Sequence, residues 1–311
     1  MYKGKRIAVI VPAYNEQAFI GSVIAAIPDF VDAIVVVDDA SGDATAECVR
    51  EAGDHRVLLL VNQANAGVGA AMVRGYRKAL ELQSDVLVKV DGDGQMPLGH
   101  LEALLDPVVE GGYGYAKGNR FLDSAALERM PKSRLLGNIA LTFLTKLASG
   151  YWHVFDPQNG FTAVSTETLG AIDLSRLHQR YFFENDMLVE LNIHRVRVKD
   201  VPMPAMYGAE ESNIRIFSVV LTFPWFLFRR FLHRVYMKYV LHDFSPIALF
   251  LSLGGLLVLW GGGFGIYLWI RGIAAHAQNS TGTVMLAALP LILGFQLVLQ
   301  GLVLDIQETP R

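Results

Sequence analysis

Residues 91–95 read Asp-Gly-Asp-Gly-Gln and directly follow the apolar run 85–90. An extended chain places alternate side chains on one side, so Asp91, Asp93 and Gln95 are expected to face the same way. Two carboxylates at that spacing repel each other unless a cation or a proton lies between them. Oxygen ligands suit Mg²⁺ or Mn²⁺, ions that usually also hold phosphate oxygens of a substrate. The stretch therefore predicts a metal site, and the alternative is an Asp- and Gly-rich turn that ends a strand.

The acidic stretch lies in a repeating pattern of short β-branched runs and helix-like segments. Strands are expected at 7–11, 33–37, 57–61 and 86–90, with helices at 15–28, 43–53 and 69–83. Continuous apolar strands that alternate with helices predict an α/β domain with a mainly parallel sheet covered on both faces. The pattern beyond residue 111 is less regular, and it predicts strands near 113–117, 161–165 and 196–201 and helices near 133–149 and 184–194.

Polar residues follow the first four predicted strands. In parallel sheets, ligands bind at the carboxyl ends of the strands, and the segments there are 12–16, 38–43, 62–69 and 91–95. Asp38 and Asp39 could accept hydrogen bonds from a base or a ribose hydroxyl. The alternative for this segment is a helix N-cap at Ser41 or Asp43. One edge of the sheet is thus expected to collect the chemistry.

Several motif classes are missing or weak. The glycine segment 67–71 has part of a dinucleotide fingerprint, but it follows the third strand, and Met72 stands where a small residue belongs. This argues against a nicotinamide enzyme. The sequence has no P-loop motif, no His and Cys spacing for zinc and no Gly-x-Ser-x-Gly elbow. The single Cys48 excludes an internal disulfide and fits a reducing compartment.

Other charged residues have two readings each. Arg120, Lys132 and Arg134 could bind a phosphate through charge-assisted bonds, or could be solvated surface charges. Glu184 and Asp186 begin a predicted helix, where acids also stabilise the helix dipole. Segment 156–161 reads as a polar turn, and segment 207–215 reads as a mobile lid or a linker.

The C-terminal third is far more apolar than the rest of this chain of 311 residues, which is 52% hydrophobic with a net charge of -3. Segments 247–270 and 283–304 contain no charged residue, and each exceeds the roughly 20 residues that cross a bilayer core. They predict two membrane helices rather than two core helices, because they are apolar on every face. The aromatic and basic segment 216–242, interrupted by Pro224, predicts helices lying on the membrane surface.

The distribution of basic residues predicts an orientation. Residues 214–242 contain Arg215, Arg229, Arg230, Arg234 and Lys238, whereas Arg271 is the one Lys or Arg between the two apolar segments. Basic flanks stay on the cytoplasmic side. We therefore expect an integral membrane protein whose catalytic domain and both termini are cytoplasmic, with loop 271–282 outside.

Together these residues resemble glycosyltransferase family 2, in its polyprenyl-phosphate branch, which includes dolichol-phosphate mannose synthases. The resemblance covers residues 7–205 and rests on VPAYNE (11–16), DDASGDAT (38–45), the glycine segment 65–70, DGDGQ (91–95), KGNRF (117–121), QNGF (158–161) and YGAEESNIR (207–215). It implies a GT-A catalytic domain at 1–212, amphipathic juxtamembrane helices at 213–243 and a two-helix transmembrane hairpin at 244–311.

The resemblance also implies an activity. This is the inverting transfer of a hexose from a nucleotide diphosphate sugar (UDP- or GDP-hexose) to a dolichyl or undecaprenyl monophosphate, with Mg²⁺ or Mn²⁺ as cofactor. Catalysis would involve Asp91, Asp93 and Asp186, and the metal would be held by Asp91, Asp93 and Gln95. The donor nucleotide would contact Pro12, Tyr14, Glu16, Asp39, Gly67 and Asp91, and the acceptor phosphate would contact Arg120, Arg134 and Arg215. Val68 departs from the family pattern, since many relatives have Lys there, and Met206 stands where Arg is frequent.

Other functions remain open. A different membrane-bound family 2 enzyme could act on the hydroxyl of a glycan or glycolipid, and a non-enzymatic protein could bind nucleotide or lipid. A processive polysaccharide synthase would normally carry Gln-x-x-Arg-Trp, which is absent. No nucleic-acid partner is expected, and the sequence leaves a homo-oligomer open.

Overall fold

A seven-stranded sheet with the strand order β3-β2-β1-β4-β6-β5-β7 forms the centre of the N-terminal part of the chain in this computed structural model. The structure describes residues 1–121, 132–204, 216–276 and 278–310. The strands are β1 (Ile7–Ala13), β2 (Ala33–Asp38), β3 (Val57–Val61), β4 (Val86–Lys89), β5 (Tyr115–Asn119), β6 (Thr162–Ser165) and β7 (Val198–Pro202). The pairs β1–β2, β2–β3, β1–β4 and β5–β7 are parallel, and β6 runs antiparallel to both β4 and β5. The mainly parallel sheet predicted from the sequence is confirmed.

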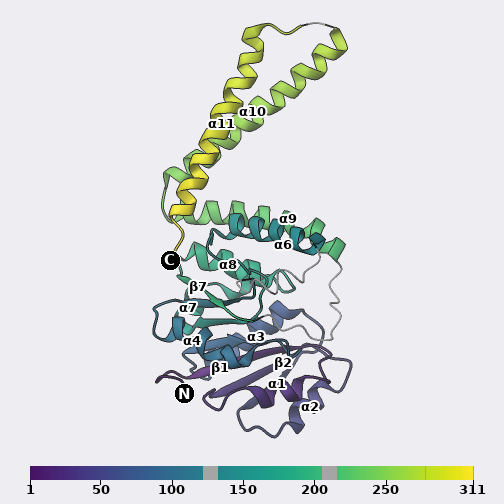
Figure 1. Ribbon diagram of the computed structural model, residues 1–311, viewed down its shortest axis with the longest axis vertical. Coiled ribbons are helices and arrows are strands. Elements are labelled where there is room, and N and C mark those ends of the chain that lie inside the picture. The colour runs from purple at the N-terminus through teal and green to yellow at the C-terminus, as the bar shows by residue number, and fades with distance from the viewer. Residues whose placement is uncertain (122–131, 205–215, 277, 311) are drawn as a thin grey trace. The chain divides into compact units, whose positions relative to one another are not determined.

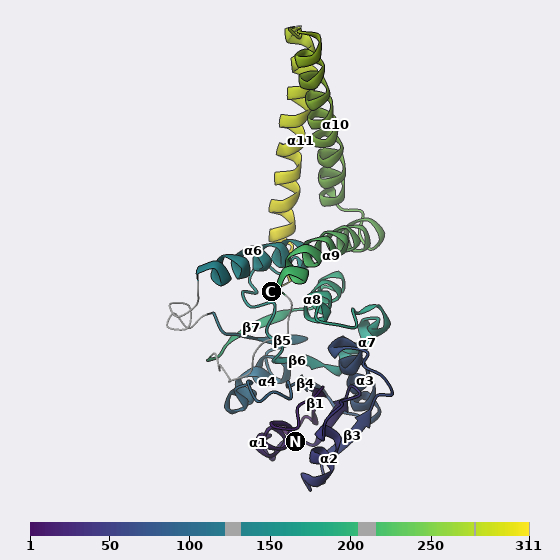
Figure 2. The same cartoon turned by 90° about the vertical axis from the view of Figure 1, so that its right-hand side faces the viewer.

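Helices cover both faces of this sheet (Figures 1 and 2). One face packs on α1 (Ile20–Ala26), α2 (Thr45–Glu51) and α4 (Leu101–Val109), and the other packs on α3 (Val68–Glu81), α7 (Thr166–Ala171) and α8 (Phe183–Ile193). Short 3₁₀ turns lie at η1 (Leu98–His100) and η2 (Leu174–Arg176). The strands β1, β2 and β4 are buried along nearly their whole length, which is why their sequences are continuously apolar rather than alternating.

The helix predicted at 15–28 is shorter in the structure, where α1 begins at Ile20. Residues 14–17 instead form a turn whose backbone is bonded to the loop after β2, and Asn15 has a positive φ of 59°. Helices α4 and α7 were not anticipated. The period of Leu101, Leu104 and Leu105, all buried, was the available signal for α4.

Helix α6 (Lys132–Ser149) packs against the first part of α9 (Ile216–Tyr236) through a separate apolar cluster. Phe223 and Leu227 of α9 contact Ala148 and Phe182. The predicted interruption at Pro224 is wrong, because α9 continues through the proline. Packing by Phe223 and Leu227 on either side of Pro224 offsets the loss of one backbone hydrogen bond.

The structure divides into two compact units, residues 1–231 and residues 232–309. The second unit contains η3 (Met237–Leu241), α10 (Pro246–Ala275) and α11 (Thr281–Gln307). The boundaries expected at 212 and 243 separate functions rather than compact units, and they stay a prediction.

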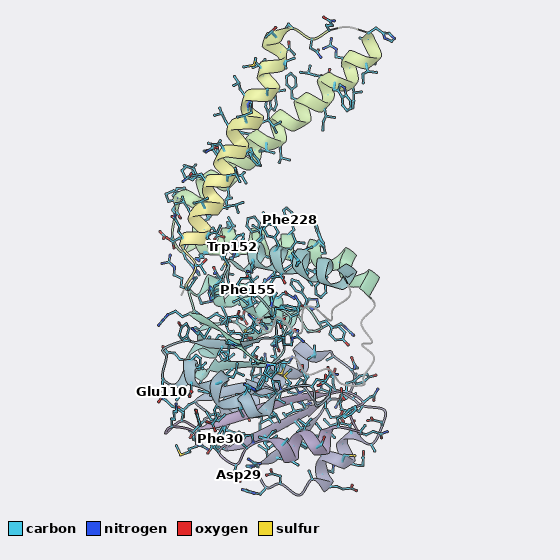
Figure 3. All side chains as sticks on the ribbon, viewed as in Figure 1. Asp29, Phe30, Glu110, Trp152, Phe155 and Phe228 are labelled. Atoms are coloured by element: carbon cyan, nitrogen blue, oxygen red, sulfur yellow. The ribbon has the colours of Figure 1, made fainter. Side chains whose placement is uncertain are left out.

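Helices α10 and α11 pack against each other over much of their length and diverge toward the turn that joins them (Figure 1). Glycines allow this close packing, since a Cβ on Gly254 would meet the Gly294 carbonyl oxygen at 2.8 Å and one on Gly261 would meet the Ala287 carbonyl oxygen at 2.6 Å. By length and composition, these two helices could cross a membrane. In the most apolar 18-residue stretch of each helix, 22% of α10 and 11% of α11 is buried. Figure 3 shows their side chains projecting outward, which does not fit helices of a soluble core.

One charged cluster lies inside the second unit. The Arg234 guanidinium pairs with Asp305 at 2.6 and 2.9 Å, and the Tyr239 hydroxyl donates to the same carboxylate at 2.6 Å. All three side chains are buried. A buried cation of this kind is stable only with its partner present, so this cluster fixes η3 and the end of α9 against the end of α11.

Candidate active site

The acidic loop follows β4 at the carboxyl edge of the sheet, as predicted. The extended conformation expected for residues 91–95 is wrong, because β4 ends at Lys89 and the chain turns at Gly94, whose φ is 73°. Within the turn, the Gln95 backbone N–H donates to Asp93 Oδ1 at 2.9 Å. Asp91 and Asp93 are both partly exposed. The turn still brings two carboxylates to the sheet edge, but each is oriented by a different partner.

Asp91 is oriented by a buried lysine that the sequence reasoning missed. The Lys89 Nζ atom lies 2.9 Å from Asp91 Oδ1 and 2.8 Å from Oε1 of Glu184, in the first turn of α8. Burial alone would lower the pKa of Lys89, but the charges of Asp91 and Glu184 reverse this and raise it. The available signal was a lysine inside an otherwise apolar strand, two positions before an acid and so on the same side of the chain.

The loops after β1 and β2 are bonded to each other. The Asn15 N–H donates to Ser41 Oγ at 2.9 Å, and the Glu16 N–H donates to Thr45 Oγ1 at 2.8 Å. Tyr14 extends from this double loop and is 50% exposed. Pro12 is buried inside β1, paired in register with Val37, rather than in the loop. The loops thus form a firm edge from which Tyr14 and Glu16 can meet a ligand.

Asp39 organises the loop after β3. Its buried carboxylate accepts the Gly67 N–H at 2.7 Å, the Ala66 N–H at 3.0 Å and the Asn62 side-chain amide at 2.6 Å. These bonds fold residues 62–67 against the end of β2. Asp39 therefore lies next to Gly67.

Gly67 and Gly69 serve close packing. A Cβ on Gly69 would lie 2.1 Å from the His178 carbonyl oxygen, and one on Gly67 would lie 2.6 Å from that of Gln179. The Ala70 N–H already donates to the Gln179 carbonyl at 3.0 Å. The first turn of α3 is therefore covered by the chain itself.

Arg120 follows β5 at the same edge of the sheet, because β5 and β4 both run antiparallel to β6 and so point the same way. Its guanidinium pairs with the fully buried Asp156. Arg134 lies in the first turn of α6, and its side chain is outside the described residues, as is all of Arg215. The structure therefore places one of the three predicted acceptor residues in detail.

Asp186 is buried in α8 and is engaged on two sides. Its Oδ2 accepts the His178 N–H at 2.8 Å, and its Oδ1 forms an ion pair with Arg230 of α9, which also pairs with Glu190. Burial raises the pKa of Asp186 to about 6, although Arg230 opposes this shift. The carboxylate links α8 to α9 and to the segment that covers Gly67 and Gly69.

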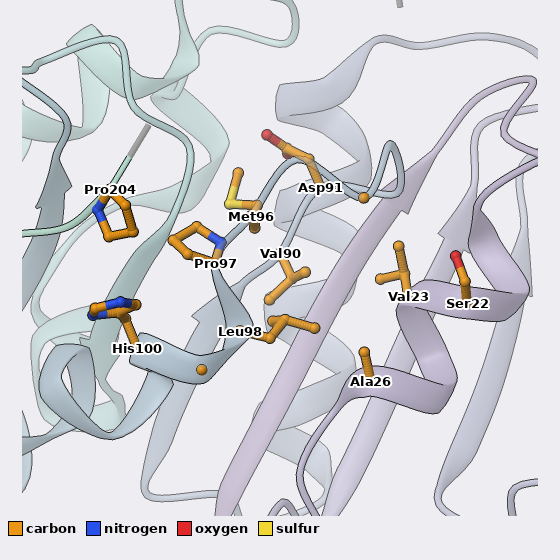
Figure 4. A pocket seen from close by; sticks show the side chains of 12 residues that line it. Ser22, Val23, Ala26, Val90, Asp91, Met96, Pro97, Leu98, His100 and Pro204 are labelled. Carbon is orange, nitrogen blue, oxygen red and sulfur yellow. The ribbon is translucent and has the colours of Figure 1, made fainter. Parts of the chain in front are cut away.

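A pocket of about 540 Å³ lies beside the acidic loop (Figure 4). Its lining is mostly apolar, with Val23 and Ala26 from α1, Val90 and Leu98 near the loop, and Pro204 opposite. Asp91 belongs to this lining, and its carboxylate points away from Val90 and Leu98. Among the described residues, no three His, Cys, Asp or Glu side chains gather as a metal site. A metal at the acidic loop would therefore take further ligands from its substrate or from water, as Mg²⁺ commonly does.

This chain is similar in sequence to several known proteins. An uncharacterised protein of Methanocaldococcus jannaschii is 32% identical over 231 residues, which cover 74% of this chain and 93% of that protein. The UDP-N-acetylglucosamine–dolichyl-phosphate N-acetylglucosaminyltransferase of Methanococcus voltae is 29% identical, in a match that covers 71% of this chain and 94% of that protein. The undecaprenyl-phosphate mannosyltransferase of Micrococcus luteus is 30% identical, in a match that covers 64% of this chain and 82% of that protein.

Among solved structures, glucosyl-3-phosphoglycerate synthase from Mycobacterium tuberculosis, in complex with Mn²⁺, UDP and glucosyl-3-phosphoglycerate, superposes with a TM-score of 0.56. The match is 22% identical and covers 74% of this chain and 80% of that one, which shows a shared GT-A fold. Residues 8–172 match the family described as glycosyl transferase family 2. The chain belongs to glycosyl transferase family 2.

Proposed function

We propose that this chain transfers a hexose, with inversion, from a nucleotide diphosphate sugar to a polyprenyl monophosphate. The observation that carries the proposal is that two acids and an arginine lie at one edge of the sheet. The acids Asp91 and Asp93 follow β4, and Arg120 follows β5. The named relatives support the acceptor, since one is a dolichyl-phosphate and another an undecaprenyl-phosphate sugar transferase.

The donor would bind at the ends of β1, β2 and β4. Tyr14 and Glu16 would contact the nucleotide. Asp39 and Gly67 would hold the neighbouring loop in place, and Pro12 is buried in β1 just before Tyr14. Asp91, Asp93 and Gln95 would hold Mg²⁺ or Mn²⁺ together with the diphosphate, since their donor atoms are all oxygen. When bound, such an ion neutralises the charge that develops on the leaving diphosphate.

The acceptor would bind through Arg120, Arg134 and Arg215. A phosphate monoester is already anionic at neutral pH, so the site has little need of a general base. Its task is to hold two anions in line, which is positioning and electrostatics. Asp186 remains a candidate catalytic residue, but its bonds to the His178 N–H and Arg230 fit the support of α8 and α9 better than proton transfer.

Helices α10 and α11 would anchor the protein in the membrane, with the catalytic domain and both termini in the cytoplasm. The basic residues from Arg229 to Lys238 support this orientation. Arg230 and Arg234 are paired with acids, but the positive-inside rule depends on Lys and Arg and only weakly on Asp and Glu.

A panel experiment tests the activity. Membranes from cells expressing the protein are incubated with labelled UDP-glucose, UDP-N-acetylglucosamine or GDP-mannose and with polyprenyl phosphate, and label is followed into the lipid fraction. The proposal predicts transfer from at least one donor that depends on the expressed protein. Absence of transfer from every hexose donor would contradict it.

A further inference from the structure

Lys89 lies where core packing alone would favour an apolar side chain. It ends β4 between Val88 and Val90, and its side chain is 3% exposed. Burying an ammonium costs free energy unless acids compensate it. Two acids do so here, and they come from different elements: Asp91 from the acidic loop and Glu184 from α8.

Gly160 leaves the space in which this cluster lies. A Cβ at Gly160 would be 2.5 Å from Lys89 Nζ and 2.6 Å from Asp91 Oδ2, closer than real Cβ contacts come. Gly160 is not among the glycines with positive φ, so its missing side chain, and not its backbone conformation, is what the cluster needs. The turn before β6 thus encloses the Lys89–Asp91 pair on a third side.

This enclosure limits how Asp91 can move. The ammonium holds its Oδ1, and its Oδ2 lies against Gly160, whose lack of a side chain leaves room for it. An exposed carboxylate would sample several rotamers, whereas one fixed by a buried cation presents its second oxygen in a single direction. The cation also offsets the repulsion between Asp91 and Asp93, two positions apart.

We propose that Lys89 is a positioning residue for the transfer reaction, which fixes the Asp91 carboxylate toward the donor. Glu184 holds the Lys89 ammonium from α8, and the missing side chain of Gly160 leaves room for the Lys89–Asp91 pair. The inference rests on the proposed function, because it assumes that Asp91 contacts the donor. The competing explanation is that Lys89 only ties β4 to α8 through Glu184.

The two explanations separate when Glu184 is neutralised first. Glu184→Gln keeps the Lys89–Asp91 pair, whereas Lys89→Met/Glu184→Gln removes the cation without leaving a buried acid at position 184. The comparison between these two variants isolates what Lys89 does for Asp91. Lys89→Met alone is expected to be the least stable variant, because it leaves two carboxylates without their cation.

Two further variants sharpen the test. Gly160→Ala keeps every charge but displaces the pair. Arg56→Met is the matched control for loss of a largely buried cation. Arg56 pairs with Asp54 at 2.7 Å and lies just before β3, at the amino ends of the parallel strands and away from the acidic loop. Arg56→Met is expected to lower the melting temperature and leave kcat and KM unchanged.

The readouts are kcat and KM for the donor, the Mn²⁺ concentration giving half-maximal rate, and calorimetric binding of UDP and GDP with Mn²⁺. We expect Lys89→Met/Glu184→Gln to have at least tenfold lower kcat/KM than Glu184→Gln, with weaker nucleotide binding and a higher Mn²⁺ requirement. Gly160→Ala should change in the same direction.

Equal kinetic constants and equal nucleotide binding for Glu184→Gln and the double variant would overturn the inference and leave Lys89 as a structural tie. The failure of the proposed function looks different, because the wild-type protein would then transfer no sugar. In that case nucleotide binding still decides whether Lys89 positions Asp91 for the nucleotide: weaker binding by the double variant supports this positioning, and equal binding overturns it.

Discussion

Arg120 and Asp156 form a two-point ion pair, with Nε 2.7 Å from Oδ2 and Nη2 3.1 Å from Oδ1. Asp156 is fully buried, whereas the Arg120 side chain is 42% exposed. Fork geometry of this kind fixes the plane of a guanidinium. The turn 156–160 therefore has two effects on the proposed site. Asp156 at its start orients Arg120, and Gly160 at its end leaves room for the Lys89–Asp91 pair.

Asp93→Asn is expected to abolish most activity without unfolding the protein. The amide oxygen of Asn can still accept the Gln95 N–H, so the turn is kept, but the charge that would bind the metal is lost. We expect kcat/KM to fall by about two orders of magnitude or more, as for the loss of a strong electrostatic contact. The checks are the transfer rate at a series of Mn²⁺ concentrations and the melting temperature. Undiminished transfer by the folded variant, or full activity in excess chelator, would remove the metal from the account.

The acceptor site predicts a selective effect of Arg134→Ala. Loss of one charge-assisted contact is worth roughly 1.5–3 kcal/mol, or about a tenfold to hundredfold effect. The loss should appear in KM for polyprenyl phosphate or in the transfer rate, with nucleotide-sugar binding nearly unchanged. Arg134→Lys should recover only part, because an ammonium lacks the planar fork.

Arg77→Ala is the matched control for Arg134, since Arg77 is an exposed arginine on α3. It should behave as the wild-type protein. Wild-type kinetics for Arg120→Ala and Arg134→Ala together would end the assignment of this pair to the acceptor. Loss of donor binding instead would move both residues to the diphosphate side.

The sequence was sufficient to predict a mainly parallel sheet covered by helices on both faces. It also predicted that the polar segments lie at the carboxyl ends of the strands. Continuous apolar strands identify a covered parallel sheet, and its carboxyl edge follows from topology. Lys89, Gly160 and Asp156 escaped prediction because their roles depend on contacts across 95, 69 and 36 residues of sequence, which pattern reasoning does not reach. The turn at Gly94 was the alternative to an extended segment, and the sequence favoured the extended one because the alternation of side chains was continued past the end of β4 at Lys89.

Asp186→Asn distinguishes a base from a supporting residue. If Asp186 were the base, its substitution would remove activity by orders of magnitude and change the acid limb of the pH profile near 6, the pKa to which burial raises it. We expect a smaller loss and an unchanged acid limb, because the second ionisation of the acceptor phosphate, near pH 6, sets that limb. The measurement is kcat/KM from pH 5 to 8 for both proteins.

The same carboxyl makes a prediction about stability. Its folded pKa of about 6 lies above its ordinary value of 3.8. Between these values, the folded state holds the proton more tightly than the unfolded state, so this group's contribution to stability falls as pH rises through that window. The difference in melting temperature between wild type and Asp186→Asn should therefore shift in favour of the variant from pH 4.5 to pH 7. A constant difference would show that Asp186 is not desolvated as described.

The proposed orientation predicts where a new cysteine becomes labelled. Gln278 is exposed in the turn between α10 and α11, and Cys48 is the single native thiol. In a Cys48→Ser background, Gln278→Cys should react with an impermeant maleimide in intact cells, whereas a cysteine at Arg77 should react only after lysis. The reverse pattern would place the catalytic domain outside.

The most direct test of the account compares two lipids that differ in one group. Purified protein is incubated with its labelled donor, Mn²⁺ and either a polyprenyl monophosphate or the matching polyprenol, and the lipid product is identified by mass spectrometry. The account predicts a hexose joined to the lipid through a phosphodiester, one nucleoside diphosphate released per transfer, and no product from the polyprenol. Transfer to the polyprenol hydroxyl, or none to the monophosphate with every hexose donor, would contradict it.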